Sequence, residues 1–217
     1  MKRLIFITLM LTLGVMIIQA QDQGNRYAEI TNPKLIDINK EAARASFYTF
    51  SNVDDAVNAS SGSKGSEFLL LNGIWKFNYS ENFNDRPQNG FYEENFNASS
   101  WSDIKVPGNW EIQGFGTPIY VNTTYEFTSP GHPPYWDKPN PPLVPHDFNP
   151  VGTYRKEFDI PSSWIGKDII VSSDGTKGAA YFYLNGEFLG MSKDSKLPAR
   201  FNITKLAKPG KNVLSIQ

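Results

Sequence analysis

Two short alternating segments joined by Asn185-Gly186 constrain the fold of this chain more than any other feature. Residues 179–184 and 187–190 flank this pair and are rich in aromatic and aliphatic side chains. Both central residues of a two-residue hairpin turn need positive φ, which Asn and Gly tolerate best. The sequence therefore predicts an antiparallel β-hairpin here, with further strands pairing to it.

Further strand signals recur at intervals of about 8 to 12 residues. Residues 74–79 place Trp75, Phe77 and Tyr79 on one face. Such short, evenly spaced strands favour a β-sandwich or jelly roll over a sheet built from βαβ units. We therefore expect an all-β fold.

Residues 154–160 form another predicted strand with two unlike faces. Tyr154, Phe158 and Ile160 share one face with Lys156, while the other face carries three charges, including Arg155. This alternation is typical of a sheet with one face in the core and one in water. We expect all three charges to be solvated.

The remaining strands and helices are short. Residues 167–172 read as a strand, and Pro209-Gly210 predicts a turn before a last strand over residues 212–217. Helical patterns are limited to a turn or two over residues 39–45 and a corner at residues 161–164. The proline-rich stretch 130–150 predicts an extended loop.

Composition narrows the class of function. The chain of 217 residues has five Trp, ten Tyr, fifteen Phe, fifteen Pro and seventeen Gly, which favours a β-rich domain with many turns. Its net charge is −1 and its basic residues are scattered, so nucleic acid is not an expected partner. No cysteine is present, and disulfides are excluded.

The first residues have the layout of an export signal. Lys2 and Arg3 precede an apolar run from Leu4 to Ile18, and Ala20 offers a small residue for cleavage. The alternative is an uncleaved anchor, but roughly 15 apolar residues are few against the about 20 that span a bilayer. We expect a signal peptide at 1–20, a periplasmic or secreted protein, and no membrane contact after cleavage.

The polar residues that follow, 21–65, are interpreted as an extended N-terminal arm and loop, and residues 66–217 as one domain. Several motifs within this domain resemble the sugar-binding domain of glycoside hydrolase family 2, in its β-galactosidase branch. The motifs are Leu71–Phe77 (LNGIWKF), Trp101–Trp110 (WSDIKVPGNW), Pro118–Asn122 (PIYVN), Asn149–Arg155 (NPVGTYR) and Asp194–Pro198 (DSKLP).

This resemblance implies a jelly-roll β-sandwich of the galactose-binding type, incomplete at its C-terminal end. The family's β-galactosidases hydrolyse terminal non-reducing β-D-galactose residues with retention, through two glutamates in a barrel domain that would follow Gln217. The resemblance therefore implies a β-galactoside as the sugar, the remaining domains of the enzyme as partners, and no hydrolysis by this chain alone. The full enzyme can be a homo-oligomer and can use Mg and Na ions, none of them held by this chain.

Asn122 is the residue that the resemblance assigns to the sugar, because the family's equivalent asparagine reaches the galactose pocket. Its amide can both donate to and accept from hydroxyls. Asn122-Thr-Thr is also a glycosylation-type triplet, and loop asparagines often cap turns. Tyr120 is a second candidate, which could stack on a sugar ring or pack in the core. Trp110 and Tyr125 could also stack on a sugar, but we expect such residues to be buried anchors of the fold more often.

Other residues that could carry chemistry fit structural roles better. His132 and His146 lack the further ligands that a metal site needs. Glu93 and Glu94 are neighbours that would point to opposite faces of a strand, so they do not form a catalytic pair. The tryptophans at positions 75 and 101 are expected in the core.

Two alternatives to the enzyme domain remain open. One is a free-standing carbohydrate-binding module with the same fold. The other is a structural domain that shapes a barrel mouth or a subunit interface without touching sugar.

Overall fold

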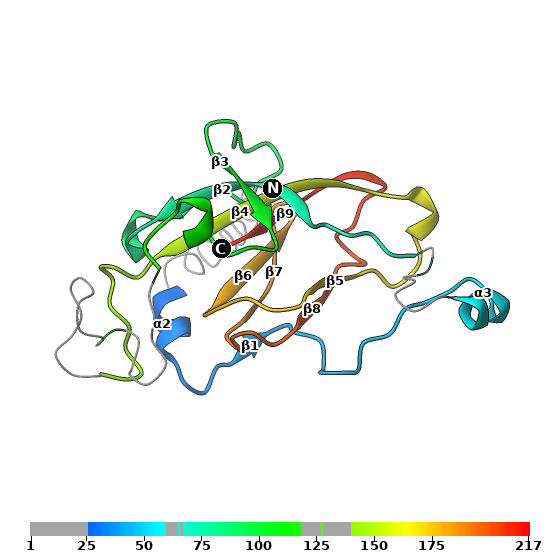
Figure 1. The fold of residues 1–217 in the computed structure, drawn as a ribbon, viewed down its shortest axis with the longest axis horizontal. Coiled ribbons are helices and arrows are strands. Elements are labelled where there is room, and N and C mark those ends of the chain that lie inside the picture. Colours follow the sequence, from blue (N-terminus) through cyan, green and yellow to red (C-terminus); the bar gives the residue numbers. More distant parts are fainter. Residues whose placement is uncertain (1–25, 60–64, 66, 119–126, 128–139) are drawn as a thin grey trace, which may run out of the picture.

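A computed structural model describes residues 26–59, 65, 67–118, 127 and 140–217 of the chain. These residues form two antiparallel sheets with few and short helices (Figure 1). The all-β class is therefore confirmed. The predicted signal peptide, Tyr120, Asn122 and His132 lie outside the described residues.

The larger sheet contains β1 (Asp37–Ile38), β2 (Gly73–Ser80), β3 (Ser102–Val106), β4 (Val151–Ile160), β6 (Ala180–Leu184), β7 (Glu187–Ser192) and β9 (Gly210–Ile216). Its order is β1-β7-β6-β9-β4-β2-β3, and every neighbouring pair is antiparallel. The smaller sheet pairs β5 (Ile170–Ser173) with β8 (Ala199–Asn202). The last strand, β9, is thus central and paired on both sides by β4 and β6.

Short helices connect and extend these strands. They are α2 (Arg26–Thr31), α3 (Val53–Asn58) and the 3₁₀ turns η1 (Phe83–Asp85), η2 (Glu111–Gln113) and η4 (Ser162–Trp164). The corner predicted at residues 161–164 is confirmed by η4. None of the helices in the described ranges is long and apolar enough to span a bilayer.

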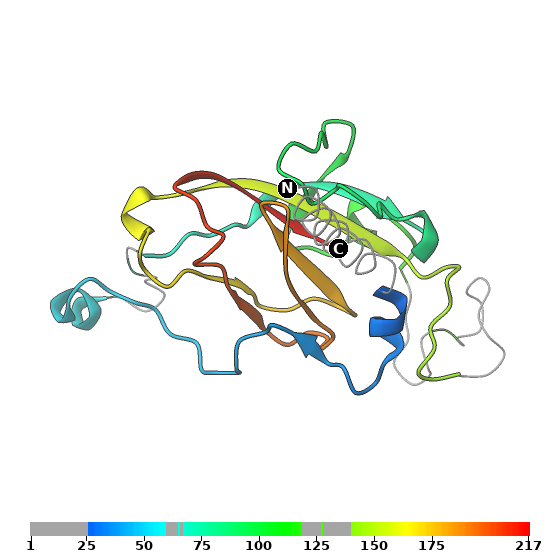
Figure 2. The same ribbon diagram turned by 180° about the vertical axis from the view of Figure 1, so that it is seen from behind.

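The main core lies between the two sheets, whose strands Figure 2 shows from behind. Trp75, Phe77, Phe182 and Leu214 from the larger sheet meet Phe201 from the smaller one, and all five are at most 5% exposed. The face predicted for Trp75, Phe77 and Tyr79 is therefore confirmed. Burial of several aromatic rings in one layer supplies most of the driving force for this packing.

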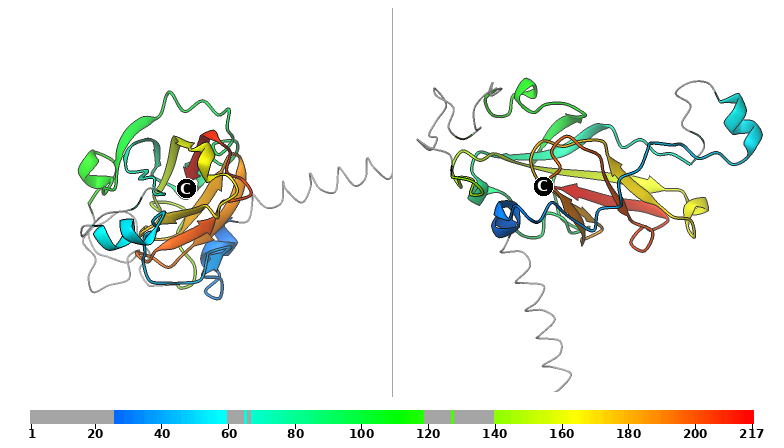
Figure 3. Two further views of the ribbon diagram at one scale, coloured as in Figure 1. Left: turned by 90° about the vertical axis from the view of Figure 1, so that its right-hand side faces the viewer. Right: turned by 90° about the horizontal axis from the view of Figure 1, so that it is seen from below.

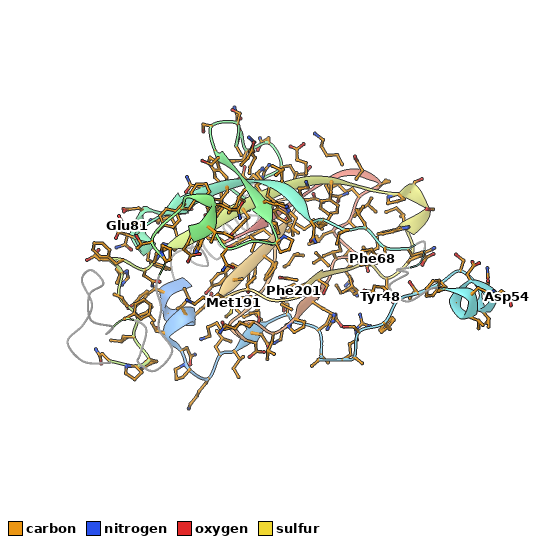
Figure 4. The ribbon with its side chains drawn as sticks, viewed as in Figure 1. Tyr48, Asp54, Phe68, Glu81, Met191 and Phe201 are labelled. Atoms are coloured by element: carbon orange, nitrogen blue, oxygen red, sulfur yellow. The ribbon has the colours of Figure 1, made fainter. Side chains whose placement is uncertain are left out.

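A second core covers the opposite face of β6 and β7. It contains Phe91, Tyr181, Tyr183 and Met191, and Trp101 packs at its margin. Residues of the arm and of the loop that precedes β3 cover this face. Figure 4 labels Met191 and Phe201, which lie inside the molecule, whereas Glu81 and Asp54 lie at its periphery. The prediction that Trp75 and Trp101 are core residues is borne out, with Trp101 only partly buried.

The Asn185-Gly186 hairpin is confirmed. Asn185 has φ of 52° and Gly186 has φ of 92°, the left-handed values that a two-residue turn requires. The Asn185 side chain also donates to Leu206 O at 2.9 Å and to Asn212 Oδ1 at 2.8 Å. The turn residue therefore fixes the approach to β9 as well as the hairpin itself.

The expectation that all three charges on β4 face water is wrong for Arg155. This side chain is 4% exposed, and it donates to Phe91 O at 3.1 Å and Glu94 O at 2.8 Å. The loop that precedes β3 lies over this face of the sheet and encloses the guanidinium. Alternation in a single strand cannot reveal a covering loop that comes from elsewhere in the sequence.

The helical turn predicted over residues 39–45 is also wrong, because Asn39 is a bend and residues 40–45 have no regular secondary structure. Its anchor to the sandwich begins at Asn39, which has φ of 56° and donates to Leu189 O at 3.0 Å. Lys40 pairs with Asp194 and lies 3.3 Å from Asp37. Glu41 N–H then donates to Arg200 O at 2.8 Å, along the edge of β8.

Beyond this anchor the arm leaves the sandwich. Residues 41–49 and 51–58 are exposed, and α3 stands clear of both sheets (Figure 3). Its start is fixed locally, since the Asn52 side chain accepts from Asp55 N–H at 2.8 Å. Tertiary contacts add little to this helix.

Candidate functional site

The two predicted sugar-binding residues, Tyr120 and Asn122, lie outside the described residues, and their role stays a prediction. The structure does describe the segment that leads to them, from the end of β3 at Val106 to Pro118. This segment packs on the face of β2 and β4 that points into the main core. Its contacts determine where the chain enters the predicted site.

Gln113 fastens this segment to β3. Its Oε1 accepts from Lys105 N–H at 2.8 Å, and its Nε2 donates to Lys105 O at 3.1 Å. The amide therefore pairs with one residue of β3 much as a neighbouring strand would. A Cβ at Gly108 would lie 2.9 Å from the backbone oxygen of Lys105 and 2.6 Å from Gln113 Nε2, so the turn favours glycine at this position.

The pairing of Gln113 with Lys105 is called the Gln113 latch below. Five aromatic rings form a cluster beside it: Phe77, Tyr79, Trp110, Phe115 and Tyr154. The ring of Phe77 contacts Phe115 edge to face, with 4.8 Å between centroids, and contacts Tyr154 in a tilted arrangement, with 4.6 Å between centroids. Tyr79 meets Trp110 edge to face at 5.6 Å between centroids. These are preferred aromatic geometries, so the cluster holds Trp110 and Phe115 firmly against the sheet.

Two glycines allow the cluster to close. A Cβ at Gly152 on β4 would lie 2.5 Å from the Trp110 ring and 2.8 Å from Phe77. Gly116 has φ of 71°, and a Cβ there would approach the Tyr79 hydroxyl at 2.7 Å. Larger residues at either position would push the segment off the sheet.

Glu111 is the charged group in this cluster. Its Oε1 accepts from Trp110 Nε1 at 2.7 Å. Burial, and to a lesser extent the charge of Glu111, raises the pKa of Tyr154 to about 12. Burial likewise raises the pKa of Tyr79, with Glu81 and Glu111 contributing. Both phenols are thus neutral at physiological pH and serve as packing groups in the cluster.

The other candidates from the sequence occupy separate places. Glu93 and Glu94 are exposed, and Glu94 pairs with Lys208. His146 stacks on Tyr27 at 4.0 Å between centroids and lies 3.2 Å from Asn84 Oδ1. In the part of the chain that the structure describes, no group of three or more His, Cys, Asp or Glu could hold a metal ion.

Sequence reasoning found part of this site. Trp110 was expected to be an anchor in the fold, and the structure confirms that it packs against the main core. The latch by Gln113 and the close approach at Gly152 were missed. The sequence feature that could have indicated the latch is the Pro107-Gly108 turn just before Trp110, because a turn at the end of a strand needs contacts that hold it against the sheet.

Comparison with known proteins identifies the chain. A model of the glycosyl hydrolases family 2 sugar-binding domain matches residues 68–217. The chain belongs to glycosyl hydrolase family 2. The resemblance drawn from the motifs is therefore confirmed at the level of the family, and this match covers the aromatic cluster and its latch.

The relatives similar to this chain are bacterial β-galactosidases. The enzyme of Halalkalibacterium halodurans is 44% identical over 147 residues, which are 68% of this chain and 14% of the relative. The enzyme of Priestia megaterium is 33% identical and covers 89% of this chain and 18% of the relative. For Psychromonas ingrahamii the identity is 35%, over 92% of this chain and 17% of the relative. The chain thus spans less than a fifth of the length of these relatives.

Solved structures similar to this chain include β-glucuronidases. The Bacteroides uniformis β-glucuronidase is 22% identical, covers 67% of this chain and 14% of that protein, and has a TM-score of 0.45. A β-glucuronidase from an uncultured Clostridium species is 22% identical, with coverage of 67% and 21% and a TM-score of 0.44.

Proposed function

We propose that this chain is the N-terminal sugar-binding domain of an exported β-galactosidase that removes terminal non-reducing β-D-galactose with retention. The observation that supports this most is its 33% to 44% identity to three bacterial β-galactosidases over 68% to 92% of its length. Family membership alone leaves the sugar open, since the matching family model describes a sugar-binding domain without naming a sugar.

In this proposal the domain orients substrate and other parts of the enzyme perform the chemistry. Asn122 binds sugar hydroxyls through its donor and acceptor, and Tyr120 contacts the ring. The aromatic cluster and the Gln113 latch hold the chain just before these residues. A rigid support matters because a displaced hydrogen-bonding group loses much of its effect on the transition state.

The catalytic pair belongs outside this chain. Retention requires two carboxyl groups about 5 to 5.5 Å apart, one as nucleophile and one as acid and then base. The proposal assigns no role to Mg or Na bound by this chain, because its described residues contain no cluster of three or more His, Cys, Asp or Glu side chains. Residues 1–217 alone should therefore release no sugar.

The test is substitution of Asn122→Ala in the full-length enzyme, with Asn97→Ala as the matched control. Asn97 is exposed and also lies in an Asn-x-Ser triplet, and its side chain accepts from the nearby Ser99 N–H at 2.9 Å. The expected loss in kcat/KM for a p-nitrophenyl β-galactoside is about 10- to 100-fold for Asn122→Ala, the range for a lost transition-state hydrogen bond. The control should be unaffected.

Four outcomes would count against the proposal. Equal activity of Asn122→Ala and Asn97→Ala would remove Asn122 from the site. Faster hydrolysis of a β-glucuronide than of the β-galactoside would show that the enzyme's preferred substrate is not a β-galactoside. Turnover by residues 21–217 alone would place catalysis within this chain, and saturable galactose binding by that fragment without turnover would favour a carbohydrate-binding module.

A further inference from the structure

Three Asn-Gly pairs occur in this chain, at positions 72–73, 89–90 and 185–186. In such a pair the main-chain nitrogen of glycine can attack the side-chain carbonyl carbon of the asparagine, because glycine has no Cβ to hinder the approach. The reaction needs a glycine N–H without a hydrogen-bond partner and an asparagine side chain that is able to turn toward it. The three pairs differ in both respects.

The side chain of Asn185 is held away from Gly186. It donates to Leu206 O at 2.9 Å and to Asn212 Oδ1 at 2.8 Å. Its Oδ1 also accepts from Val213 N–H at 2.9 Å. All three hydrogen bonds must break before the carbonyl carbon can reach the glycine nitrogen. The pair that builds the hairpin is therefore protected from the reaction.

The Asn72-Gly73 pair is protected by the sheet. Gly73 stands opposite Val106, and the neighbouring position of β3 is Lys105. The Lys105 N–H and C=O both bond to the Gln113 side chain, so they point away from β2. Because pairs alternate along an antiparallel ladder, Gly73 and Val106 form a hydrogen-bonded pair, and the Gly73 N–H faces β3. The attacking nitrogen of this pair is thus engaged in the sheet.

The Asn89-Gly90 pair meets both conditions. Asn89 is exposed, and both residues lie in a bend outside the helices and strands. Within the described part of the chain, neither the Asn89 side chain nor the Gly90 N–H forms a hydrogen bond. Gly90 has φ of 72°, and apart from its chain neighbours no heavy atom lies within 4 Å of the position that a Cβ would take. The space around the attacking nitrogen is therefore open.

We propose that Asn89 is a site of spontaneous covalent modification in the folded enzyme. The Gly90 nitrogen attacks Asn89 Cγ, and a new C–N bond closes a succinimide ring. The bond between Cγ and Nδ2 breaks, and the side-chain nitrogen leaves as ammonia with the proton that the Gly90 nitrogen gives up. Water then opens the ring at either carbonyl, which produces aspartate or isoaspartate. Water is the one co-reactant, and the inference does not rest on the proposed function.

Isoaspartate alters the loop that covers Arg155. It routes the main chain through the Cβ of residue 89, which lengthens the chain by a methylene group shortly before Phe91. The Phe91 ring is 1% exposed in the second core, and its carbonyl accepts from Arg155 at 3.1 Å. A close-packed ring of this kind resists displacement. The added length therefore opens the adjacent turn, in which Glu93 N–H donates to Gly90 O at 3.0 Å.

The test follows all three pairs in the full-length enzyme during incubation at mildly alkaline pH, with aspartate and isoaspartate at each position quantified by peptide mass spectrometry. Digestion in heavy-oxygen water marks the sites that react during handling. In urea the three pairs should react at similar rates. In the folded enzyme Asn89 should keep its rate, whereas Asn72 should react about 10-fold more slowly for one lost hydrogen bond and Asn185 about 100-fold more slowly for three. A rate at Asn89 as low as that at Asn185 would overturn the proposal.

Two variants provide a second measurement, by amide hydrogen exchange at Glu93. Asn89→Gln keeps an amide but does not readily close the succinimide ring, and Asn89→Asp adds the charge without the longer main chain. Incubation should speed exchange at Glu93 about 10-fold in the isoaspartate form of the enzyme, through loss of its hydrogen bond to Gly90 O, and should leave Asn89→Gln unchanged. Freshly purified Asn89→Asp should match the fresh enzyme. Equal exchange in the incubated enzyme and incubated Asn89→Gln would contradict the proposed change in the loop.

Discussion

Replacement of Arg155 by methionine should destabilise the domain strongly, although no carboxylate within the described ranges hydrogen-bonds to its guanidinium. Nη1 donates to Phe91 O at 3.1 Å and lies 3.4 Å from Ser215 Oγ, and Nη2 donates to Glu94 O at 2.8 Å. Burial lowers the pKa of this group, but a guanidinium stays charged at neutral pH. It therefore holds two carbonyls of the covering loop at once.

The magnitude follows from what methionine leaves behind. Glu94 O loses its donor and Phe91 O keeps only a long bond from Ser215 Oγ at 3.5 Å, at a cost of about 1 to 3 kcal/mol each, with the lower end appropriate for the partly buried Glu94 O. Removal of a desolvated charge offsets part of this cost, and the methionine side chain keeps much of the apolar stem contact. We expect the free energy of unfolding to fall by about 2 to 4 kcal/mol.

Urea unfolding of the purified protein measures this change. With an m-value of about 2 kcal/mol/M, the midpoint should fall by about 1 to 2 M. Lys211→Met is the control, because Lys211 on the adjacent strand forms an exposed ion pair with Glu157 at 2.8 Å, and its loss should leave the midpoint unchanged. Equal midpoints for the two variants would refute the reasoning, as would full recovery by Arg155→Lys, which lacks the planar fork.

Three other changes test further parts of the fold. A Cβ at Gly190 would lie 2.3 Å from Ile38 O, so Gly190→Ala should displace β1 and cost about 1 to 3 kcal/mol in thermal unfolding, and an unchanged Tm would contradict the contact. Burial raises the pKa of Tyr154 to about 12, so the unfolded state loses this proton at lower pH than the folded state does. The free energy of unfolding should therefore fall between about pH 10 and 12. In unfolding measured over this pH range, Tyr154→Phe should reduce the fall. Lys193 Nζ donates to Glu29 O, Ile30 O and Asn32 O and so caps the C-terminal end of α2. Lys193→Met should therefore speed amide hydrogen exchange in α2. Equal exchange rates in the two proteins would show that this lysine does not stabilise the helix.

The local features of the fold could be predicted because they depend on neighbouring residues. The Asn185-Gly186 turn has its own φ requirement, and the alternation around Trp75 directly reports its buried face. The corner ending at Trp164 was equally visible. In each case the interaction that decides the structure lies within a few residues.

The features that were missed depend on distant partners. Arg155 is buried by a loop some 60 residues earlier in the sequence, and α2 ends against Lys193, more than 160 residues away. The extended path after Asn39 is likewise set by its contact with Leu189. A pattern in one segment contains no information about such contacts.

In the candidate site, too, the sequence predicts some residues and misses others. Trp110 could be predicted as an anchor because a large aromatic residue after a Pro-Gly turn has few alternatives to packing on the sheet. The latch by Gln113 could not, because a glutamine in an exposed turn usually meets water and its pairing with Lys105 depends on the three-dimensional path. Asn122 remains a prediction that rests on family resemblance.

The central position of β9 has a consequence for biosynthesis. Strands β1, β7 and β6 lie on one side of it and β4, β2 and β3 on the other, and β9 alone joins the two groups in the part of the chain that the structure describes. A ribosome delivers residues 210–216 after every other strand of this sheet, so the two groups emerge as separate three-stranded pieces with apolar faces exposed. Such pieces are prone to wrong pairing and to capture by chaperones. Insertion of β9 is therefore the step that unites the sheet, and a pause in translation just before residue 210 should favour aggregation.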